Sequence, residues 1–170
     1  MLTKDAILKL FNSLNEELAR QDIKGEIYLV GGAVMTLVFD ARASTRDIDA
    51  LFLPATTIRN VAFKIASKHS IDINWLNDAV KGFMSECGEF NEYLELSHLR
   101  LYTALPEYLL AMKCLSMRLG PEFHDEADIR YLLRFLNIEK YEEALAIISR
   151  YFPLERFMQK SLYALEEILI

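Results

Sequence analysis

Apolar residues recur every three or four positions near the start of the chain, a spacing that is typical of an amphipathic helix. We expect this helix over residues 3–20, with Thr3 as its N-cap. A second helix of the same kind is expected to begin at Thr56 or Thr57 and to end near residue 69. The residues predicted to face inward are Ile7, Leu10, Phe11, Leu14 and Leu18 in the first helix, and Ile58, Val61, Ala62 and Ile65 in the second.

Short apolar runs bounded by glycine, proline or polar residues predict strands. Four are expected, over residues 26–30, 47–53, 71–76 and 93–103. Between the first two, the Gly31-Gly32 turn should lead into a short helix over residues 33–39 and a polar connection over 40–46. Residues 77–84 should form one or two helical turns.

The pattern changes to a helical period at Pro106 and keeps it to the end of the chain. Helices are expected over residues 106–119, 123–136, 140–151 and 154–169. We therefore predict an α+β protein. A small mixed sheet with flanking helices over residues 1–104 should be followed by a C-terminal helical bundle over 105–170, packed on the core.

Composition restricts the classes of function. Of the 170 residues, 52% are hydrophobic, which excludes intrinsic disorder, and the net charge of −6 argues against a broad basic surface for duplex nucleic acid. A local patch could still bind the end of an RNA. No window of about 18 uncharged apolar residues and no signal peptide is visible. We expect a cytoplasmic protein without a membrane span.

Two carboxylates are the first candidate for chemistry. In a strand, residues i and i+2 point to the same face, so Asp47 and Asp49 should project together while Ile48 points into the core. Two adjacent carboxylates repel each other unless a cation lies between them, and oxygen ligands suit Mg²⁺ or Mn²⁺. Alone, such a pair is more often a solvated feature of a strand edge.

A glycine turn is the second candidate. Gly31 and Gly32 follow a strand and open a helix, so their backbone N–H groups could bind a phosphate. A Gly-Gly turn is usually only a turn. Combined with the acidic pair on a neighbouring strand, however, it favours a nucleoside triphosphate (NTP) as the ligand.

These motifs resemble the nucleotidyltransferase superfamily that includes DNA polymerase β. The resemblance is strongest to the branch with the AbiEii-type toxins and the small GG…R-x-T-x-D-I-D proteins of the DUF6036 kind. It covers roughly residues 26–136. The residues that carry it are Val30-Gly31-Gly32-Ala33, Arg42, Thr45-Arg46-Asp47-Ile48-Asp49, Trp75-Leu76-Asn77-Asp78, Lys81-Gly82-Phe83, Leu110-Ala111-Met112-Lys113, Arg118, Asp125 and Asp128.

The resemblance implies roles for these residues. Asp47 and Asp49 would bind the metal that accompanies the triphosphate, and Gly31 and Gly32 would hold the phosphates. A third catalytic carboxylate would bind a second metal. Asp72 is the candidate if residues 71–76 form a strand; Asn74 would share its face, and Asp78 is a second candidate.

The remaining candidate residues each have a structural interpretation as well as a functional one. Lys113 would be a catalytic residue: it and Arg118 would contact phosphate or neutralise charge that develops in the transition state. Asp125 and Asp128 would orient these two residues or act at the acceptor, but all four could form an ordinary solvated helix surface. Arg42, Thr45, Arg46 and Lys81 are further candidates for phosphate binding. The alternative is simple charge balance for Arg42 and Arg46, and solvation for Lys81. Trp75 could stack on a base, although a core position is favoured.

The function implied is a Mg²⁺-dependent enzyme. It would move a nucleoside monophosphate from an NTP to a hydroxyl of RNA (tRNA) or protein, in a toxin–antitoxin or phage-defence system with a cognate toxin or antitoxin as partner. One alternative is an antitoxin-type nucleotidyltransferase that adds AMP to a partner toxin. Another is a non-catalytic nucleotide-binding or protein-interaction module of the same fold. Apolar C-terminal residues could also support a homodimer.

Overall fold

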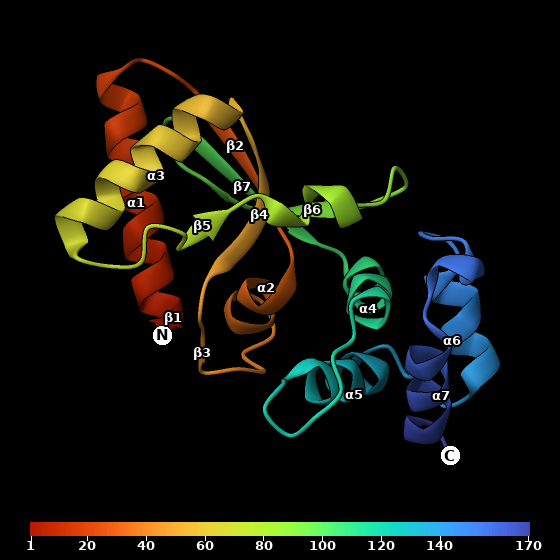
Figure 1. The fold of residues 1–170 in the computed structure, drawn as a ribbon. Coiled ribbons are helices and arrows are strands. Elements are labelled where there is room, and N and C mark those ends of the chain that lie inside the picture. Colours follow the sequence, from red (N-terminus) through yellow and green to blue (C-terminus); the bar gives the residue numbers. More distant parts are fainter. The chain divides into compact units, whose positions relative to one another are not determined.

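The computed structural model describes all residues from Met1 to Ile170 (Figure 1). It contains seven α-helices, a five-stranded mixed sheet and a two-stranded sheet, which confirms the α+β class. The chain divides into two compact units. A sheet unit comprises Met1–Gly82 and Phe90–Ala104, and a helical unit comprises Phe83–Glu89 and Leu105–Ile170.

The five-stranded sheet has the order β5-β4-β2-β7-β6. Its central strand β2 runs antiparallel to β4 and parallel to β7. The outer pairs are β4 with β5, which are parallel, and β7 with β6, which are antiparallel. The strands are β2 (Gly25–Leu29), β4 (Ile48–Leu53), β5 (Leu76–Asn77), β6 (Phe90–Glu95) and β7 (Leu99–Ala104).

Two helices bury their apolar faces against this sheet. Helices α1 (Lys4–Arg20) and α3 (Ala55–His69) lie beside each other, and α3 also packs on β4 (Figure 1). All nine residues predicted to face inward in these helices are buried. Glu17 of α1 joins the pair through an ion pair of 3.0 Å with Lys64 of α3. The periodicity of the sequence therefore predicted both helices and their buried faces correctly.

The two faces of the sheet differ in burial. In β2, Gly25, Ile27 and Leu29 are buried, whereas Glu26 and Tyr28 are half-buried. In β4, Ile48, Ala50 and Phe52 are fully buried in the same alternating way. One face is thus the apolar core, and the other carries the polar and aromatic side chains from which a site can be built.

The second sheet consists of two very short strands. Strand β1 (Leu2–Thr3) pairs with β3 (Ser44–Thr45), so that Leu2 is the partner of Thr45. The predicted helix over residues 3–20 begins one residue later, because Thr3 is its N-cap and accepts a hydrogen bond from the Ala6 N–H at 3.2 Å. Pairing with β1 fixes the polar connection that leads to the acidic residues.

The predicted strand over residues 71–76 is wrong, because only Leu76 and Asn77 are in the sheet. The side chain of Asp72 accepts a hydrogen bond from the Asn74 N–H at 2.7 Å, and its carbonyl accepts one from Trp75 at 3.1 Å. Such a local side-chain bond stabilises a turn in place of a strand. The helical turns predicted over residues 77–84 are a 3₁₀ helix at Ala79–Phe83.

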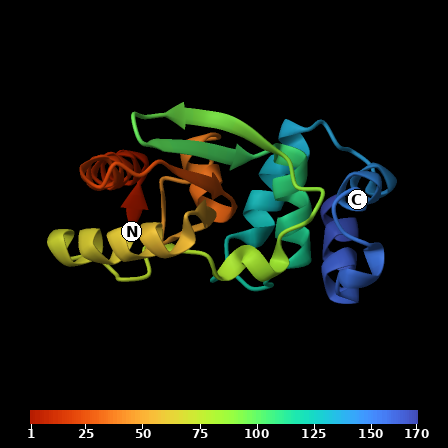
Figure 2. The same cartoon turned by 90° about the horizontal axis from the view of Figure 1, so that it is seen from above.

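The single strand predicted over residues 93–103 is also wrong, because this segment belongs to the β6–β7 hairpin (Figure 2). Leu96 donates a backbone hydrogen bond to Leu99 at 2.8 Å across the turn. The turn reverses the chain between Leu94 and Leu101, which are partners in the hairpin. The apolar residues switch from even to odd positions between Leu96 and Leu99, and that change of phase marks the turn.

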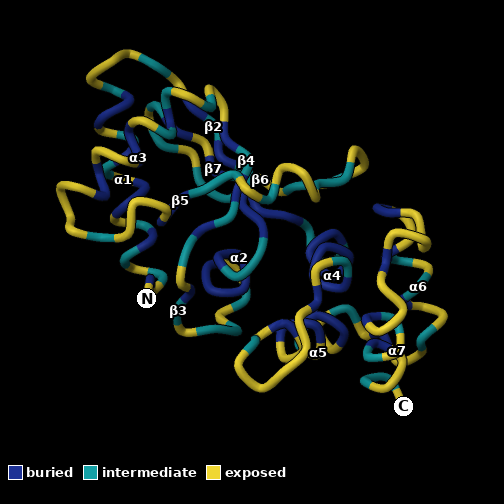
Figure 3. The backbone as a smooth tube through the Cα atoms, viewed as in Figure 1, coloured by how far each residue is buried: buried dark blue, intermediate teal, exposed yellow.

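The helical unit contains the C-terminal helices, each shorter than predicted. They are α4 (Pro106–Leu115), α5 (Asp125–Phe135), α6 (Tyr141–Ile148) and α7 (Gln159–Ile168). The helix predicted over residues 154–169 is divided, because Phe157 and Met158 are extended and separate a 3₁₀ turn (Leu154–Arg156) from α7. Helix α4 is buried from Tyr108 to Cys114 (Figure 3).

The segment Phe83–Glu89 is fastened to these helices by hydrogen bonds. The Ser85 N–H donates to the hydroxyl of Tyr108 at 2.9 Å, and the hydroxyl of Tyr151 donates to Glu89 at 2.8 Å. Burial and the Glu89 hydrogen bond raise the pKa of Tyr151.

Among all the helices, none has the length and apolar character needed to cross a membrane.

Candidate functional site

A glycine bend connects β2 to the following helix. Helix α2 (Gly31–Leu37) begins at Gly31, whose φ of +67° lies in the left-handed region that favours glycine. Its N-cap, Val30, is extended, and no side chain caps the helix. The first backbone N–H groups of a helix have no partner within the helix. This bend therefore presents N–H donors that could form hydrogen bonds to an anion.

The carboxylate of Asp49 lies directly against this bend. A Cβ added at Gly31 would be 3.3 Å from Oδ2 of Asp49. The backbone agrees, because the Val30 N–H donates to the Asp49 carbonyl at 3.1 Å. The structure therefore brings together the glycine turn and one of the two acids that the sequence singled out.

Asp47 stands at the start of β4, one residue before the strand. Asp47 and Asp49 are half-buried, whereas Ile48 and Ala50 between and after them are fully buried. This alternation puts both carboxylates on the side of the chain away from the apolar core. Thr45 supports the arrangement, since its hydroxyl donates to the Asp47 carbonyl at 3.1 Å.

A guanidinium group covers the second glycine. A Cβ at Gly32 would overlap Nη1 of Arg42 and would be 2.9 Å from the hydroxyl oxygen of Thr45. Arg42 and Thr45 are therefore neighbours of the glycine bend. Arg46, between them and the acids in sequence, is exposed. The bend, with its own backbone donors, thus has the Arg42 guanidinium, the Thr45 hydroxyl and the Asp49 carboxylate as neighbours.

The residue beside Asp49 on the neighbouring strand is Asn77. In the parallel pairing of β4 with β5, Asp49 is the partner of Asn77, so their side chains emerge on the same face. Sequence reasoning did not single out Asn77 as a site residue and expected Asp72, which lies in the turn before the strand. The apolar pair Trp75-Leu76 immediately before Asn77 is the signal that could have marked the start of this strand.

The other candidates around β5 have structural partners. Asp78 forms ion pairs with Arg59 at 2.7 Å and with Lys81 at 3.4 Å. The Lys81 side chain is largely exposed. Trp75 is buried, and its indole N–H donates to the Ala62 carbonyl at 2.9 Å, which confirms the core interpretation for this residue.

The oxygen atoms at the acidic pair suit a hard divalent cation. No group of three or more His, Cys, Asp or Glu side chains that could hold a metal ion occurs in the chain. The set consists instead of two carboxylates with the amide of Asn77 beside one of them. Mg²⁺ is commonly bound by one or two carboxylates together with substrate phosphates and water, so the residues present fit this ion.

The helical unit holds a second charged cluster. Nζ of Lys113 is 2.8 Å from Asp128 and 3.5 Å from Asp125. The side chains of Lys113, Asp125 and Asp128 are 9%, 4% and 3% exposed, so they do not form a solvated helix surface. Arg118 joins the cluster through its backbone N–H and its guanidinium, each 2.9 Å from Oδ2 of Asp125, but its side chain is 61% exposed.

This cluster connects α4, α5 and the loop between them. Burial by itself would raise the pKa of Asp125, but the hydrogen bonds from Arg118 and the charge of Lys113 lower it below the ordinary value. The carboxylates thus hold Lys113 and the backbone at Arg118 in place. A direct contact of Lys113 or Arg118 with phosphate stays a prediction.

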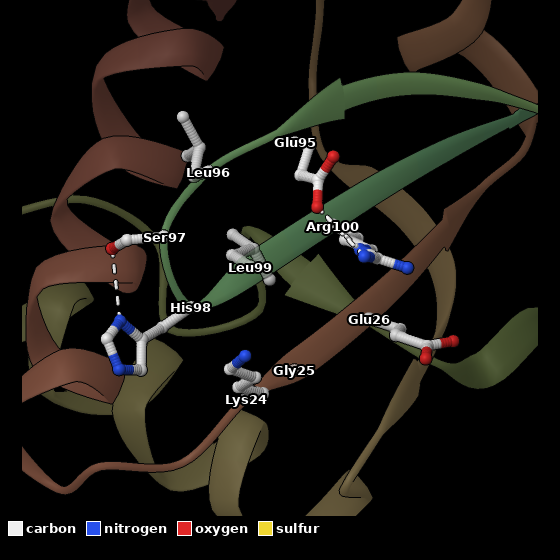
Figure 4. Close-up of a pocket in the computed structure, with 9 residues that line it drawn as sticks. All are labelled: Lys24, Gly25, Glu26, Glu95, Leu96, Ser97, His98, Leu99 and Arg100. Carbon is white, nitrogen blue, oxygen red and sulfur yellow. Dashed lines mark hydrogen bonds and ion pairs between the residues drawn. The ribbon is translucent and has the colours of Figure 1, made fainter.

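A pocket of about 280 Å³ lies at the other end of β2 (Figure 4). It is lined by Lys24–Glu26 and by Glu95–Arg100, that is, by the start of β2 and the turn of the β6–β7 hairpin. Gly31 follows the opposite end of β2, so this pocket is separate from the glycine bend.

Comparison with known proteins gives the family of the chain. No curated protein and no solved structure matches the chain. A family model described as a nucleotidyltransferase of unknown function (DUF6036) matches residues 5–156. The match includes the glycine bend, the acidic pair and the Lys113 cluster. The chain therefore belongs to the DUF6036 family of nucleotidyltransferases.

Proposed function

We propose that this protein transfers a nucleoside monophosphate from an NTP to a hydroxyl group of an RNA or a protein. The contact between the Gly31 bend and the carboxylate of Asp49 is the observation that supports this function best. Backbone N–H groups that could bind phosphate and a carboxylate that could bind a cation lie next to each other there, as the binding of a metal-bound triphosphate would require.

The metal would be held by Asp47 and Asp49. Asn77 is the strand partner of Asp49, and its amide oxygen also accepts a hydrogen bond from the Ala79 N–H at 3.3 Å. When bound, Mg²⁺ supplies positive charge that neutralises the polyphosphate. The backbone N–H groups at Gly31 and Gly32 would bind phosphate oxygens, and Arg42 and Thr45 would add a charge and a hydroxyl at the same bend.

In the reaction, the acceptor oxygen forms a bond to the α-phosphorus while the bond to the oxygen bridging to the β-phosphorus breaks. Pyrophosphate leaves with that electron pair, and the hydroxyl proton passes to water. Donors fixed at the glycine bend stabilise the charge on the leaving pyrophosphate, because they need no reorganisation when the bond breaks.

A second candidate function is nucleotide binding without transfer. It is favoured by Asn77, which gives a neutral amide at the position beside Asp49. A neutral group there cannot accept the proton of an attacking hydroxyl, and it attracts a second cation more weakly than a carboxylate would.

Incubation with labelled NTPs and Mg²⁺ tests these functions. The acceptor is total tRNA or the protein encoded by a neighbouring gene. Label on the RNA indicates the toxin-type reaction, and label on the protein indicates the antitoxin-type reaction. Asp49→Asn should abolish transfer, while Asp5→Asn, an exposed acid in the first turn of α1, should not change it. The Asp72→Asn variant tests whether the carboxylate in the turn takes part in transfer, since transfer should fall only if it does.

Metal-dependent NTP binding that disappears in Asp49→Asn, with no transfer to either acceptor, would favour the second candidate. If Asp49→Asn transfers label as well as the unchanged protein does, the acidic pair is not the catalytic site.

A further inference from the structure

Two tyrosines stack on the face of the sheet that also carries Asp49. Tyr28 of β2 and Tyr102 of β7 are Cα partners in the parallel pairing, and their rings are 4.7 Å apart and within 8° of parallel. The edge of the group is closed by Phe90, whose ring meets Tyr28 edge to face at 5.2 Å. Neither tyrosine is fully buried.

This pair is in the row of side chains next to the candidate metal site. Tyr28 is the partner of Leu51 on β4, and Leu51 follows Asp49 by two residues on the same face. Two residues along a strand correspond to about 7 Å. The tyrosines are therefore within the reach of a single nucleotide whose phosphates lie at Gly31 and Asp49.

The stack with Tyr102 occupies one face of the Tyr28 ring. Tyr102 covers the face of Tyr28 that is directed toward β7, so the other face of the ring is directed toward β4 and the half-buried Leu51. An aromatic face above an aliphatic side chain is a surface on which a flat heterocycle can stack.

The charges around the two stacked tyrosines favour the binding of a single base over the binding of a nucleic acid strand. The next row of the sheet consists of Glu26, Arg100 and Glu95, which are successive partners across β2, β7 and β6 (Figure 4). The hydroxyl of Tyr28 donates to Glu26, and Arg100 is paired with Glu95 at 2.8 Å. Carboxylates repel a phosphate backbone, but they can accept hydrogen bonds from the amino groups of a base.

We infer that Tyr28, supported by Tyr102, forms the subsite for the base of the bound nucleoside triphosphate. This inference rests on the proposed function and extends it, since it assigns the base to the row of the sheet that follows the acids. The Glu26 carboxylate borders the subsite and would favour bases that carry an amino group.

Calorimetry can separate the base from the phosphates. The probes are the four NTPs and inorganic tripolyphosphate, each with Mg²⁺, because tripolyphosphate has the phosphates and no base. Stacking of one base contributes roughly 5- to 150-fold in affinity, so at least one NTP should bind tighter than tripolyphosphate by about this factor. Tyr28→Leu should remove that preference and leave the affinity for tripolyphosphate unchanged.

Three further variants make the test specific. Tyr28→Phe keeps the ring and should keep most of the preference. Tyr102→Leu removes the support and should reduce it. Tyr93→Leu changes a tyrosine at the bulge of β6, outside the stack, and serves as the matched control. Thermal melts establish that each variant is folded.

Two results would overturn the inference while leaving the proposed function intact. One is an unchanged NTP preference in Tyr28→Leu, and the other is equal affinity of the unchanged protein for NTPs and tripolyphosphate. Binding of neither probe would overturn the proposed function together with this subsite.

Discussion

Gly31 and Asp49 are in contact although one opens a helix and the other lies in a strand: a Cβ on Gly31 would be 3.3 Å from the Asp49 carboxylate. Two separate features require a glycine at position 31. Its positive φ is unfavourable for any residue with a Cβ, and the space that a Cβ would occupy is the space beside the carboxylate.

Gly31→Ala should therefore lower the free energy of unfolding by about 1–2 kcal/mol, the cost of a left-handed conformation for a residue with a Cβ. It should also weaken Mg²⁺-dependent NTP binding, because the carboxylate must move. Urea denaturation and calorimetry measure the two effects. The matched control is Gly82→Ala, since a Cβ at Gly82 meets no atom within 4 Å. Equal losses in both variants would show that the bend has no special requirement.

The pairing of Asp49 with Asn77 gives a second prediction. Asn77→Asp would put a third carboxylate beside the acidic pair and should tighten Mn²⁺ binding by at least about fivefold, since one unit charge about 4 Å from another is worth about 1 kcal/mol even in water. Without metal the variant should be less stable, and Mn²⁺ should restore its melting temperature.

Asn74→Asp is the control for this change. It adds the same charge in the exposed turn before β5, where no pairing with Asp49 exists. If both variants bind Mn²⁺ equally well, Asn77 is not at the metal site and the charge acts only at long range.

The buried ion pairs of Lys113 give a third prediction. Lys113→Met should lower the free energy of unfolding by about 3–5 kcal/mol, because it leaves the carboxylates of Asp125 and Asp128 buried without their cation. Arg130→Met is the matched control, since it removes an exposed pair with Glu126 that is worth about 0–1 kcal/mol. A loss below 1 kcal/mol in Lys113→Met would contradict a structural role for this lysine.

The lowered pKa of Asp125 gives a fourth prediction, in acid. The folded-state pKa lies below the ordinary value of 3.8 for an aspartate, so the carboxylate adds stability above that pH and loses its contribution as the pH falls through the folded-state pKa. The stability difference between the unchanged protein and Asp125→Asn should be constant from about pH 5 to 7 and should shrink below about pH 4. Denaturation curves over pH 3–7 measure it, and a difference that grows in acid would have the wrong sign.

Local patterns predicted those parts of the fold that depend on neighbouring residues. The helical spacing of Leu10, Leu14 and Leu18 was sufficient to place α1 and its buried face, and the alternation around Ile48 was sufficient to orient Asp47 and Asp49. Features set by distant parts of the chain were missed. The pairing of Leu2 with Thr45 joins two-residue strands that have no periodicity of their own.

The same distinction applies to the candidate site. The glycines and acids stand in a recognisable order in the sequence. The partner of Asp49, however, depends on the register between β4 and β5. Because Asp72 lies in a turn before β5, the residue paired with Asp49 is Asn77 and not the expected Asp72. The burial of Lys113 likewise depends on how α4 and α5 pack, which spacing along the chain does not specify.

The segment Phe83–Glu89 lies between two parts of the sheet unit in sequence but belongs to the helical unit. The polypeptide therefore passes between the units after Gly82, after Glu89 and after Ala104. A single proteolytic cut at any of these positions would leave one unit interrupted, so neither can be excised as one continuous fragment. Joining the sheet unit to a different helical unit would require two simultaneous exchanges, so the two units are expected to be inherited together.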